Sequence, residues 1–336
     1  MGLPGRVFVT GASGFVGGAI VRHAMSRGCE VRALARTERA AASIARLGAT
    51  PIRVRLDDET GLTRAMGGCR TVFHVAGTSE MCPRDPAGMD RVNVQGTGAV
   101  LRAAGRADVG RVVHTSSAAT IGERAGTIGR EDTPHRGSFL NEYERSKLLG
   151  ERRAFQAGRE FGVEVVSVNP SSVQGPGRTE GTARLLMRAA RSRIAVLMHT
   201  WLSIVDVDDC AEAHLLAAEH GTAGGRYLVS GASLPVVRAV DLVRRLSGRP
   251  RYVLWMPRAT AETAVPLVQA VSRAWPEARL CPAMLRTLLH GHRYDGSLAT
   301  RALGLRYTAL DRTLERTLEW YAERGLLDRG PARRMR

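Results

Sequence analysis

Short apolar runs alternate with longer segments of helical spacing through the first half of the chain. The runs that predict strands lie at residues 6–10, 30–35, 51–55, 71–75, 111–116 and 164–169. Between them, apolar residues recur every three or four positions, which predicts helices over 15–26, 85–106 and 138–161. A further helix is expected after the second strand and ends at about Leu47. Strands that alternate with helices of this length form crossover units, so we expect an α/β fold with a doubly wound parallel sheet.

The composition argues against several classes of protein. The chain has 336 residues and a formal net charge of +17, from 49 Lys and Arg against 32 Asp and Glu. The cations are spread along the whole length and form no basic block with interleaved aromatic residues, so the charge does not predict a nucleic-acid partner. No apolar run is long enough for a membrane span, and the first residues lack the pattern of a signal peptide.

Cysteine and histidine positions point to neither a disulfide framework nor a metal site. The five cysteines are widely separated and contain no CxxC pair: Cys29, Cys69, Cys82, Cys210 and Cys281. We expect reduced thiols in a cytoplasmic protein. His74, His114, His199 and His214 are isolated and lack the spacing of metal ligands, so no metal is expected.

A glycine-rich turn directly follows the first expected strand. In TGASGFVGG, Gly11, Gly14 and Gly17 recur every third residue, with Ser13, Phe15 and Val16 between and beside them. Glycines at such a turn allow backbone N–H groups at a helix start to approach a pyrophosphate. The turn therefore predicts dinucleotide binding. A glycine turn that merely packs is the alternative, which the position between strand and helix disfavours.

The end of the second strand indicates which dinucleotide is bound. Many NAD-binding folds place an acidic residue there, where it contacts the ribose hydroxyls. This chain has Arg36 at that position and Arg39 three residues later. An arginine fork suits a 2′-phosphate, so we expect NADP(H), with NAD(H) as the alternative.

Tyr143 and Lys147 lie four residues apart on an expected helix and so project from one face. The phenol of a free tyrosine has a pKa near 10, which a neighbouring ammonium lowers. Arginine does not fit this role because it stays protonated and has a broad planar fork. Lys147 is the single lysine among 49 basic residues, which indicates that chemistry selected it.

Hydroxyl side chains end the fifth expected strand, at Thr115, Ser116 and Ser117. The carboxyl edge of an open parallel sheet is where such folds bind their ligands. A hydroxyl there can hold a substrate carbonyl beside Tyr143. Serine pairs are also common turn caps, so these residues indicate a catalytic site only in combination with Tyr143 and Lys147.

The alternation of strands and helices loosens after Asn169, and proline-marked segments follow. We expect a smaller substrate lobe in this part of the chain. The expected division is a cofactor-binding core at 1–170 with 203–230 returning to it, a substrate lobe at 171–202 and 231–330, and a frayed basic tail at 331–336.

These residues together resemble the extended short-chain dehydrogenases/reductases, also called the NAD-dependent epimerase/dehydratase family. The resemblance spans nearly the whole chain and rests on TGASGFVG, VFHVAG, NVQGT, HTSSA, YxxxK, NPSSVQGPG, VDVDDCAEAH and RYDGSLATRALGLRY. Within the family, the chain is most similar to the dihydroflavonol reductase and 3β-hydroxysteroid dehydrogenase-like branch. The resemblance implies a Rossmann fold and helices near 86–106 and 140–161 that can form a homodimer.

The resemblance also implies roles for individual residues. Ser117, Tyr143 and Lys147 would form the catalytic triad, with Tyr143 as the proton donor. Further residues would line the cofactor site: Leu56, Val75, Ala76, Gly77, Thr115, Pro170 and Val173. Arg55 stands where the family usually has an aspartate that touches adenine, with Asp57 and Asp58 following.

Two departures favour one reaction within the family. Ile121-Gly122 replaces the Tyr-Gly of many sugar-nucleotide epimerases, and Ser116-Ser117 replaces the Thr-Asp-Glu of the 4,6-dehydratases. We therefore expect an NADPH-dependent ketoreductase for an apolar small molecule, such as a natural-product intermediate. We expect the substrate to enter between residues 78–84, 121–126 and the lobe after Gly175. A nucleotide-sugar epimerase or dehydratase with tightly bound NAD, and a non-catalytic cofactor sensor, are the alternatives.

Overall fold

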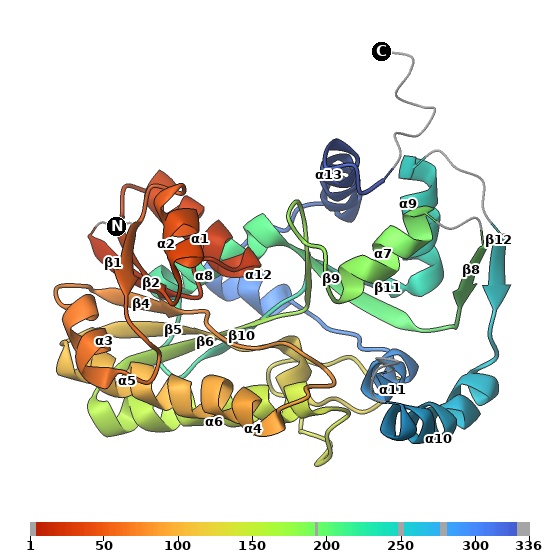
Figure 1. Cartoon of the computed structure of the whole chain (residues 1–336), viewed down its shortest axis with the longest axis horizontal. Helices are drawn as coiled ribbons and strands as arrows, with labels where there is room; N and C mark the ends of the chain where they lie inside the picture. The colour runs from red at the N-terminus through yellow and green to blue at the C-terminus, as the bar shows by residue number, and fades with distance from the viewer. Residues whose placement is uncertain (1–4, 192–193, 248–251, 276–280, 328–336) are drawn as a thin grey trace.

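The computed structural model describes residues 5–191, 194–247, 252–275 and 281–327. Within them, seven parallel strands form a central sheet in the order β10-β6-β5-β4-β1-β2-β3 (Figure 1). Their bounds are β1 Arg6–Thr10, β2 Glu30–Ala35, β3 Thr50–Arg53, β4 Thr71–His74, β5 Arg111–Thr115, β6 Glu164–Pro170 and β10 Arg226–Val229. The expected doubly wound parallel sheet is confirmed.

Helices cover both faces of this sheet (Figure 1). One layer holds α1 (Phe15–Ser26), α2 (Glu38–Ala45), α8 (Val207–His220) and α12 (Ser297–Leu303). The other holds α3 (Glu59–Met66), α4 (Pro86–Asp90), α5 (Gly96–Arg106) and α6 (Glu142–Phe161). Successive strand residues face opposite layers. Phe73 therefore packs into the core beside α1 and α8, whereas Phe8 and Val72 pack beside α3 and α5.

The second half of the chain builds a lobe at one end of the sheet (Figure 1). Its small sheets are β11-β9-β7 and β12-β8. The strands are β7 Ser172–Gln174, β8 Ile194–Leu197, β9 Trp201–Asp206, β11 Ala232–Pro235 and β12 Tyr252–Trp255. The helices are α7 Thr182–Arg191, α9 Val236–Ser247, α10 Arg258–Ala274, α11 Pro282–His290 and α13 Leu310–Glu323. Leu186, Val240 and Tyr321 belong to a separate apolar core between α7, α9 and α13.

Two expected helices have different bounds in the structure. A π-helical turn over Arg91–Gln95 separates α4 from α5, so 85–106 is not one continuous α-helix. The side chain of Asn93 in that turn binds the backbone of Thr78 and the hydroxyl of Ser146. Helix α6 begins at Glu142 rather than near Ser138, because Asn141 caps it by accepting a hydrogen bond from the N–H of Glu144.

The expectation that all five cysteines are reduced is wrong for one pair. Cys82 and Cys281 form a disulfide, with their Cα atoms 5.8 Å apart, whereas the other three cysteines are buried and form no disulfide. The two partners lie 199 residues apart in sequence, so no local spacing signalled the bond. None of the described helices combines the length and apolar character needed to cross a bilayer. The expected tail at 331–336 lies outside the described residues.

Candidate active site

The glycine-rich turn forms a close-fitting cradle between β1 and α1. Gly11 has φ +72°, and a Cβ there would lie 2.7 Å from the backbone N of Ala76. A Cβ on Gly17 would overlap the carbonyl oxygen of Gly11. Gly14 is the N-cap of α1, and no side chain caps this helix or places a carboxylate in its first turn. The backbone N–H groups around Ser13, Phe15 and Val16, at the start of this helix, therefore suit a pyrophosphate.

Arg36 and Arg39 lie exposed after β2, where the 2′-phosphate pocket is expected. Neither side chain has a hydrogen bond or ion pair within the described part of the chain. Their neighbour Glu38 pairs instead with Arg53 on β3. Two unpaired guanidinium groups at this sheet edge fit a phosphate, because charge-assisted bonds would replace only their water contacts.

The position after β3 differs from the family pattern in a definite way. The guanidinium of Arg55 makes two hydrogen bonds, of 2.9 and 2.8 Å, with the carboxylate of Asp57. Asp58 caps α3 by accepting from the N–H of Gly61 at 2.9 Å. Leu56 packs against Gly96, where a Cβ would lie only 2.5 Å from its Cδ2. Asp57 and Asp58 are thus both engaged, one with Arg55 and the other as a helix cap.

The remaining expected cofactor residues lie along the carboxyl edge of the sheet. Val75 and Ala76 donate their N–H groups to the hydroxyl of Thr10, which fixes the turn after β4. A Cβ on Gly77 would lie 3.1 Å from Oδ1 of Asn93 and 3.8 Å from Nζ of Lys147, so the segment after β4 passes close to both side chains. Pro170 ends β6, and Val173 lies buried in β7.

Ser117, Tyr143 and Lys147 meet where β5 ends beside α6. The side chain of Ser117 lies beside Tyr143 and favours its ionised form. The Ser117 hydroxyl also accepts a hydrogen bond from the N–H of Ala119 at 3.2 Å. Nζ of Lys147 donates to the carbonyl oxygen of Thr115 at 2.6 Å. Ser117 is 7% exposed and Lys147 is 8% exposed, so the site excludes most water around both polar groups.

Burial controls the ionisation of the two helical residues. Burial lowers the pKa of Lys147 to about 8, although the charge of Glu151 acts in the opposite direction. Burial raises the pKa of Tyr143, while the side chain of Ser117 and the charge of Arg178 oppose that shift. The net shift is upward, so the lowered Tyr143 pKa expected from the sequence is not found, because burial outweighs the groups that favour the phenolate.

A buried polar network supports the loop that carries Ser117. The amide of Asn169, at the end of β6, donates to the carbonyl of Ser117 at 3.4 Å and to the hydroxyl of Thr120 at 3.0 Å. The carboxylate of Glu151 on α6 accepts from the same amide and pairs with Arg226 at 2.9 Å. The loop that carries Ser117 and helix α6 are therefore held by one set of interactions.

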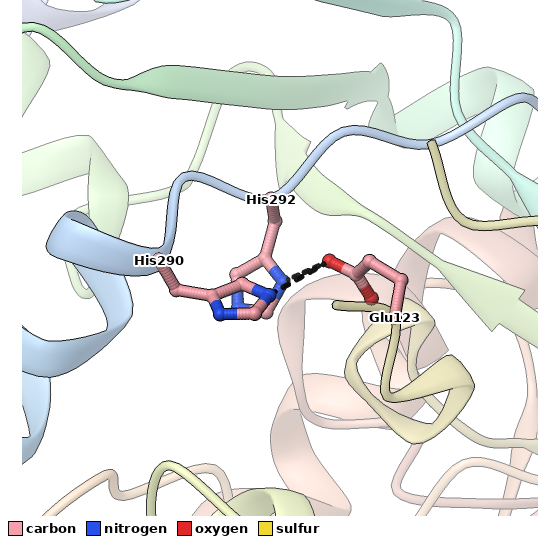
Figure 2. Close-up of side chains that lie close together, drawn as sticks. All are labelled: Glu123, His290 and His292. Atoms are coloured by element: carbon pink, nitrogen blue, oxygen red, sulfur yellow. Dashed lines mark hydrogen bonds and ion pairs between the residues drawn. The ribbon is translucent and has the colours of Figure 1, made fainter. Parts of the chain in front are cut away.

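The segments expected to border the substrate converge on α11. The disulfide joins Cys82, in the loop after β4, to Cys281 at the N-cap of α11. Asn141, the N-cap of α6, donates to the hydroxyl of Thr287 at 3.1 Å. Glu123, in the loop after Ser117, lies against His290 and His292 at the end of α11 (Figure 2). Sequence reasoning missed these two histidines, although HGH at residues 290–292 is a visible signal.

Known proteins are similar to this chain in both sequence and fold. Residues 7–230 match the model of the NAD dependent epimerase/dehydratase family. A 4-hydroxy-2-methyl-3-oxo-4-farnesyl-3,4-dihydroquinoline-1-oxide ketoreductase of Stigmatella aurantiaca is 32% identical over 306 residues, which cover 89% of this chain and 91% of the relative. A dihydroflavonol 4-reductase of Callistephus chinensis is 27% identical over 267 residues, which cover 72% of this chain and 73% of the relative.

A solved structure described as gox2253 superposes with a TM-score of 0.85 at 28% identity, covering 96% of this chain and 99% of its own. The match includes the lobe as well as the central sheet, so it confirms the Rossmann-like architecture. The family model covers both the glycine-rich turn and the Tyr143–Lys147 pair. The chain therefore belongs to the NAD dependent epimerase/dehydratase family, the extended short-chain dehydrogenases/reductases, and is an NAD(P)-dependent oxidoreductase.

Proposed function

We propose that this protein is an NADPH-dependent reductase that converts a ketone on a largely apolar small molecule into an alcohol. The observation that carries the proposal is the meeting of Ser117, Tyr143 and Lys147 at the carboxyl end of β5. Relatives named as a farnesyl-dihydroquinoline oxide ketoreductase and a dihydroflavonol 4-reductase support a carbonyl substrate on an apolar skeleton.

Each of these three residues has a task in the proposed reaction. A bound nicotinamide dinucleotide supplies the hydride. The hydroxyl of Ser117 holds the substrate oxygen, and the phenol of Tyr143 donates a proton to that oxygen. The ammonium of Lys147 stabilises the phenolate that remains. The low exposure of Ser117 and Lys147 strengthens these interactions, since little water competes for them.

The preference for NADPH rests on a different part of the molecule. Arg36 and Arg39 are unpaired within the described residues, and no carboxylate replaces them at the end of β2. A 2′-phosphate would gain charge-assisted hydrogen bonds here, whereas a bare ribose hydroxyl would gain little. We expect Arg36→Ala to weaken NADPH binding at least tenfold and to leave NADH binding within about twofold.

Titration with NADPH and NADH, followed by fluorescence, measures both affinities. Arg46→Ala is the matched control, because Arg46 is also exposed but lies at the far end of α2. Mass spectrometry of the denatured protein first identifies any cofactor that co-purifies. Stoichiometric NAD that resists exchange would contradict the reductase and favour the epimerase, because an epimerase regenerates its cofactor in every cycle.

Tyr143→Phe separates the enzyme from a cofactor sensor. The variant should bind NADPH normally and reduce apolar ketones at least a hundredfold more slowly, because it lacks the proton donor. An unchanged biological function in this variant would favour the sensor.

A further inference from the structure

Three titratable side chains form a closed cluster between the sheet domain and the lobe. Glu123 lies in the loop after the 3₁₀ turn Ala118–Ile121, His290 ends α11, and His292 follows two residues later (Figure 2). One ligand atom from each residue lies within 4.8 Å of the others. None of these residues takes part in the proposed hydride and proton transfers.

The cluster is buried and its donor atoms converge. Nδ1 of His292 lies 2.6 Å from Oε1 of Glu123, and Nε2 of His290 lies 3.4 Å from the same oxygen. Glu123 is 1% exposed, and the side chains of His290 and His292 are 7% and 16% exposed. The hydroxyl of Tyr294 lies 2.9 Å from Nδ1 of His292 and closes one side of the cluster.

One of the converging nitrogens and the second oxygen of the Glu123 carboxylate have no hydrogen-bond partner. Oε2 of Glu123 and Nε2 of His290 are buried and unsatisfied. Within the described residues, no Lys or Arg pairs with the Glu123 carboxylate: the nearby Arg136 donates to the Glu123 backbone and pairs with Glu144. A buried carboxylate that faces two imidazoles and pairs with no Lys or Arg is stabilised by a protonated histidine or by another cation.

The backbone holds both sides of the cluster in place. Gly129, on the Glu123 loop, donates to the carbonyl of Arg293 at 2.8 Å and accepts from the N–H of Asp295 at 3.0 Å. The hydroxyl of Ser203 on β9 donates to the carbonyl of His292 at 3.0 Å. The three donor groups thus come from fixed segments, as a metal site needs.

We propose that Glu123, His290 and His292 bind a divalent transition-metal ion, for which Zn²⁺ is the best match. Two imidazole nitrogens and one carboxylate oxygen suit zinc, whereas Ca²⁺ and Mg²⁺ prefer oxygen ligands alone. Ligands about 2.0 Å from a tetrahedral zinc lie roughly 3.3 Å apart. The 3.4 Å separation of His290 Nε2 and Glu123 Oε1 already matches. The 2.6 Å separation of His292 Nδ1 and Glu123 Oε1 would lengthen by less than about 1 Å, and the two histidine nitrogens lie within 4.8 Å of each other.

The bound ion would have a structural task. It would join the loop after Ser117 to the C-terminal end of α11, whose N-terminal end is already tied to the core by Cys281. Thr287, between these two ties, contacts Asn141 at the start of the catalytic helix. With three protein ligands, the fourth position is left for water.

The test uses the full-length protein without a histidine tag, stripped with a chelator and then dialysed against ZnCl₂. We expect elemental analysis to find one zinc per chain. We expect a rise in Tm of roughly 3–6 °C when free zinc exceeds Kd a hundredfold. Glu123→Gln and His290→Asn should each weaken zinc binding at least a hundredfold by calorimetry and lose the Tm shift.

His220→Asn is the matched control, because it removes a half-exposed histidine on α8 and should leave zinc binding unchanged. If the cluster variants fail to fold, zinc content and the Tm shift of the wild-type chain still decide the matter. A wild-type chain that retains no zinc and shows no shift would overturn the proposal. Equal zinc retention by wild type and Glu123→Gln would also overturn it. Neither readout depends on reductase activity.

Discussion

At Lys147, an unusual feature of the composition coincides with a specific structural position. It is the single lysine among 49 basic residues, and its ammonium lies buried between the catalytic helix and the end of β5. A guanidinium there would carry a broad planar fork into a space bounded by Gly77 and Thr115. The compact ammonium fits between Gly77 and the carbonyl of Thr115.

The lowered pKa of Lys147 predicts a pH-dependent contribution to stability. Burial lowers its pKa from 10.5 to about 8, so the folded chain binds fewer protons than the unfolded chain between these values. The free energy of unfolding should therefore rise with pH in this window, by up to about 3 kcal/mol from this residue. Urea unfolding of wild type and Lys147→Met at pH 7 and pH 10 measures the difference.

The same variant supplies the control, because Lys147→Met removes only this ionisation. The stability gap between wild type and variant should shift in favour of wild type as pH rises. A gap that stays constant from pH 7 to pH 10 would show that the ammonium is not destabilised by burial.

Some residues of the candidate site could be predicted from neighbouring sequence, and others could not. Gly11, Gly14 and Gly17 could be predicted because a turn between strand and helix lies within ten residues of sequence. The pairing of Glu123 with His290 and His292 could not, since these residues lie far apart in the chain and only the docking of α11 joins them. The HGH triplet at residues 290–292 indicated two candidate metal ligands, but not that Glu123 lies beside them.

At the scale of elements, prediction succeeded where local capping and alternation decide the structure. The bounds of β1, α1 and β2 agree with the expected ranges 6–10, 15–26 and 30–35. The start of α6 was readable in principle, because Asn141 and Glu144 form a capping pattern. The π turn at Arg91–Gln95 was not, because the side chain of Asn93 makes its contacts with Thr78 and Ser146, distant in sequence.

Asp206 links two elements and predicts a measurable loss of stability. It caps α8 by accepting from the N–H of Asp208 at 2.8 Å, and it accepts from the hydroxyl of Thr313 on α13 at 2.7 Å. Its side chain is fully buried and also pairs with Arg316. Asp206→Ala should lower the free energy of unfolding by about 2–4 kcal/mol, because a cap is lost and buried donors lose their acceptor.

Asp208→Ala is the comparison, since the Asp208 side chain is 36% exposed and contributes from the surface. Chemical denaturation of both variants tests the ranking. A loss for Asp206→Ala no greater than that for Asp208→Ala would mean that α13 is held mainly by its apolar core.

At the scale of the whole molecule, the lobe was predictable in outline but not in detail. The change in pattern after Asn169 marked its beginning. Its small sheets depend on pairs such as β12 with β8 and β7 with β9, whose register is set by packing between distant segments. The same distance explains why the Cys82–Cys281 disulfide could not be predicted from sequence spacing.

That disulfide links the lobe covalently to the central domain. It closes a separation of 199 residues and ties the loop after β4 to the start of α11. Cys82→Ser and Cys281→Ser should each lower stability under oxidising conditions by about 2–5 kcal/mol, because the unfolded chain regains its freedom. The double variant should lose no more than either single variant, since both changes break the same bond.

Thiol labelling gives an independent measurement. After unfolding without reductant, an alkylating reagent should modify three cysteines, Cys29, Cys69 and Cys210, and after reduction it should modify all five. Five modified thiols before reduction would contradict the covalent tie. In that case α11 would be held to the catalytic helix through Asn141 and Thr287, and the serine variants would match wild type in stability under all redox conditions.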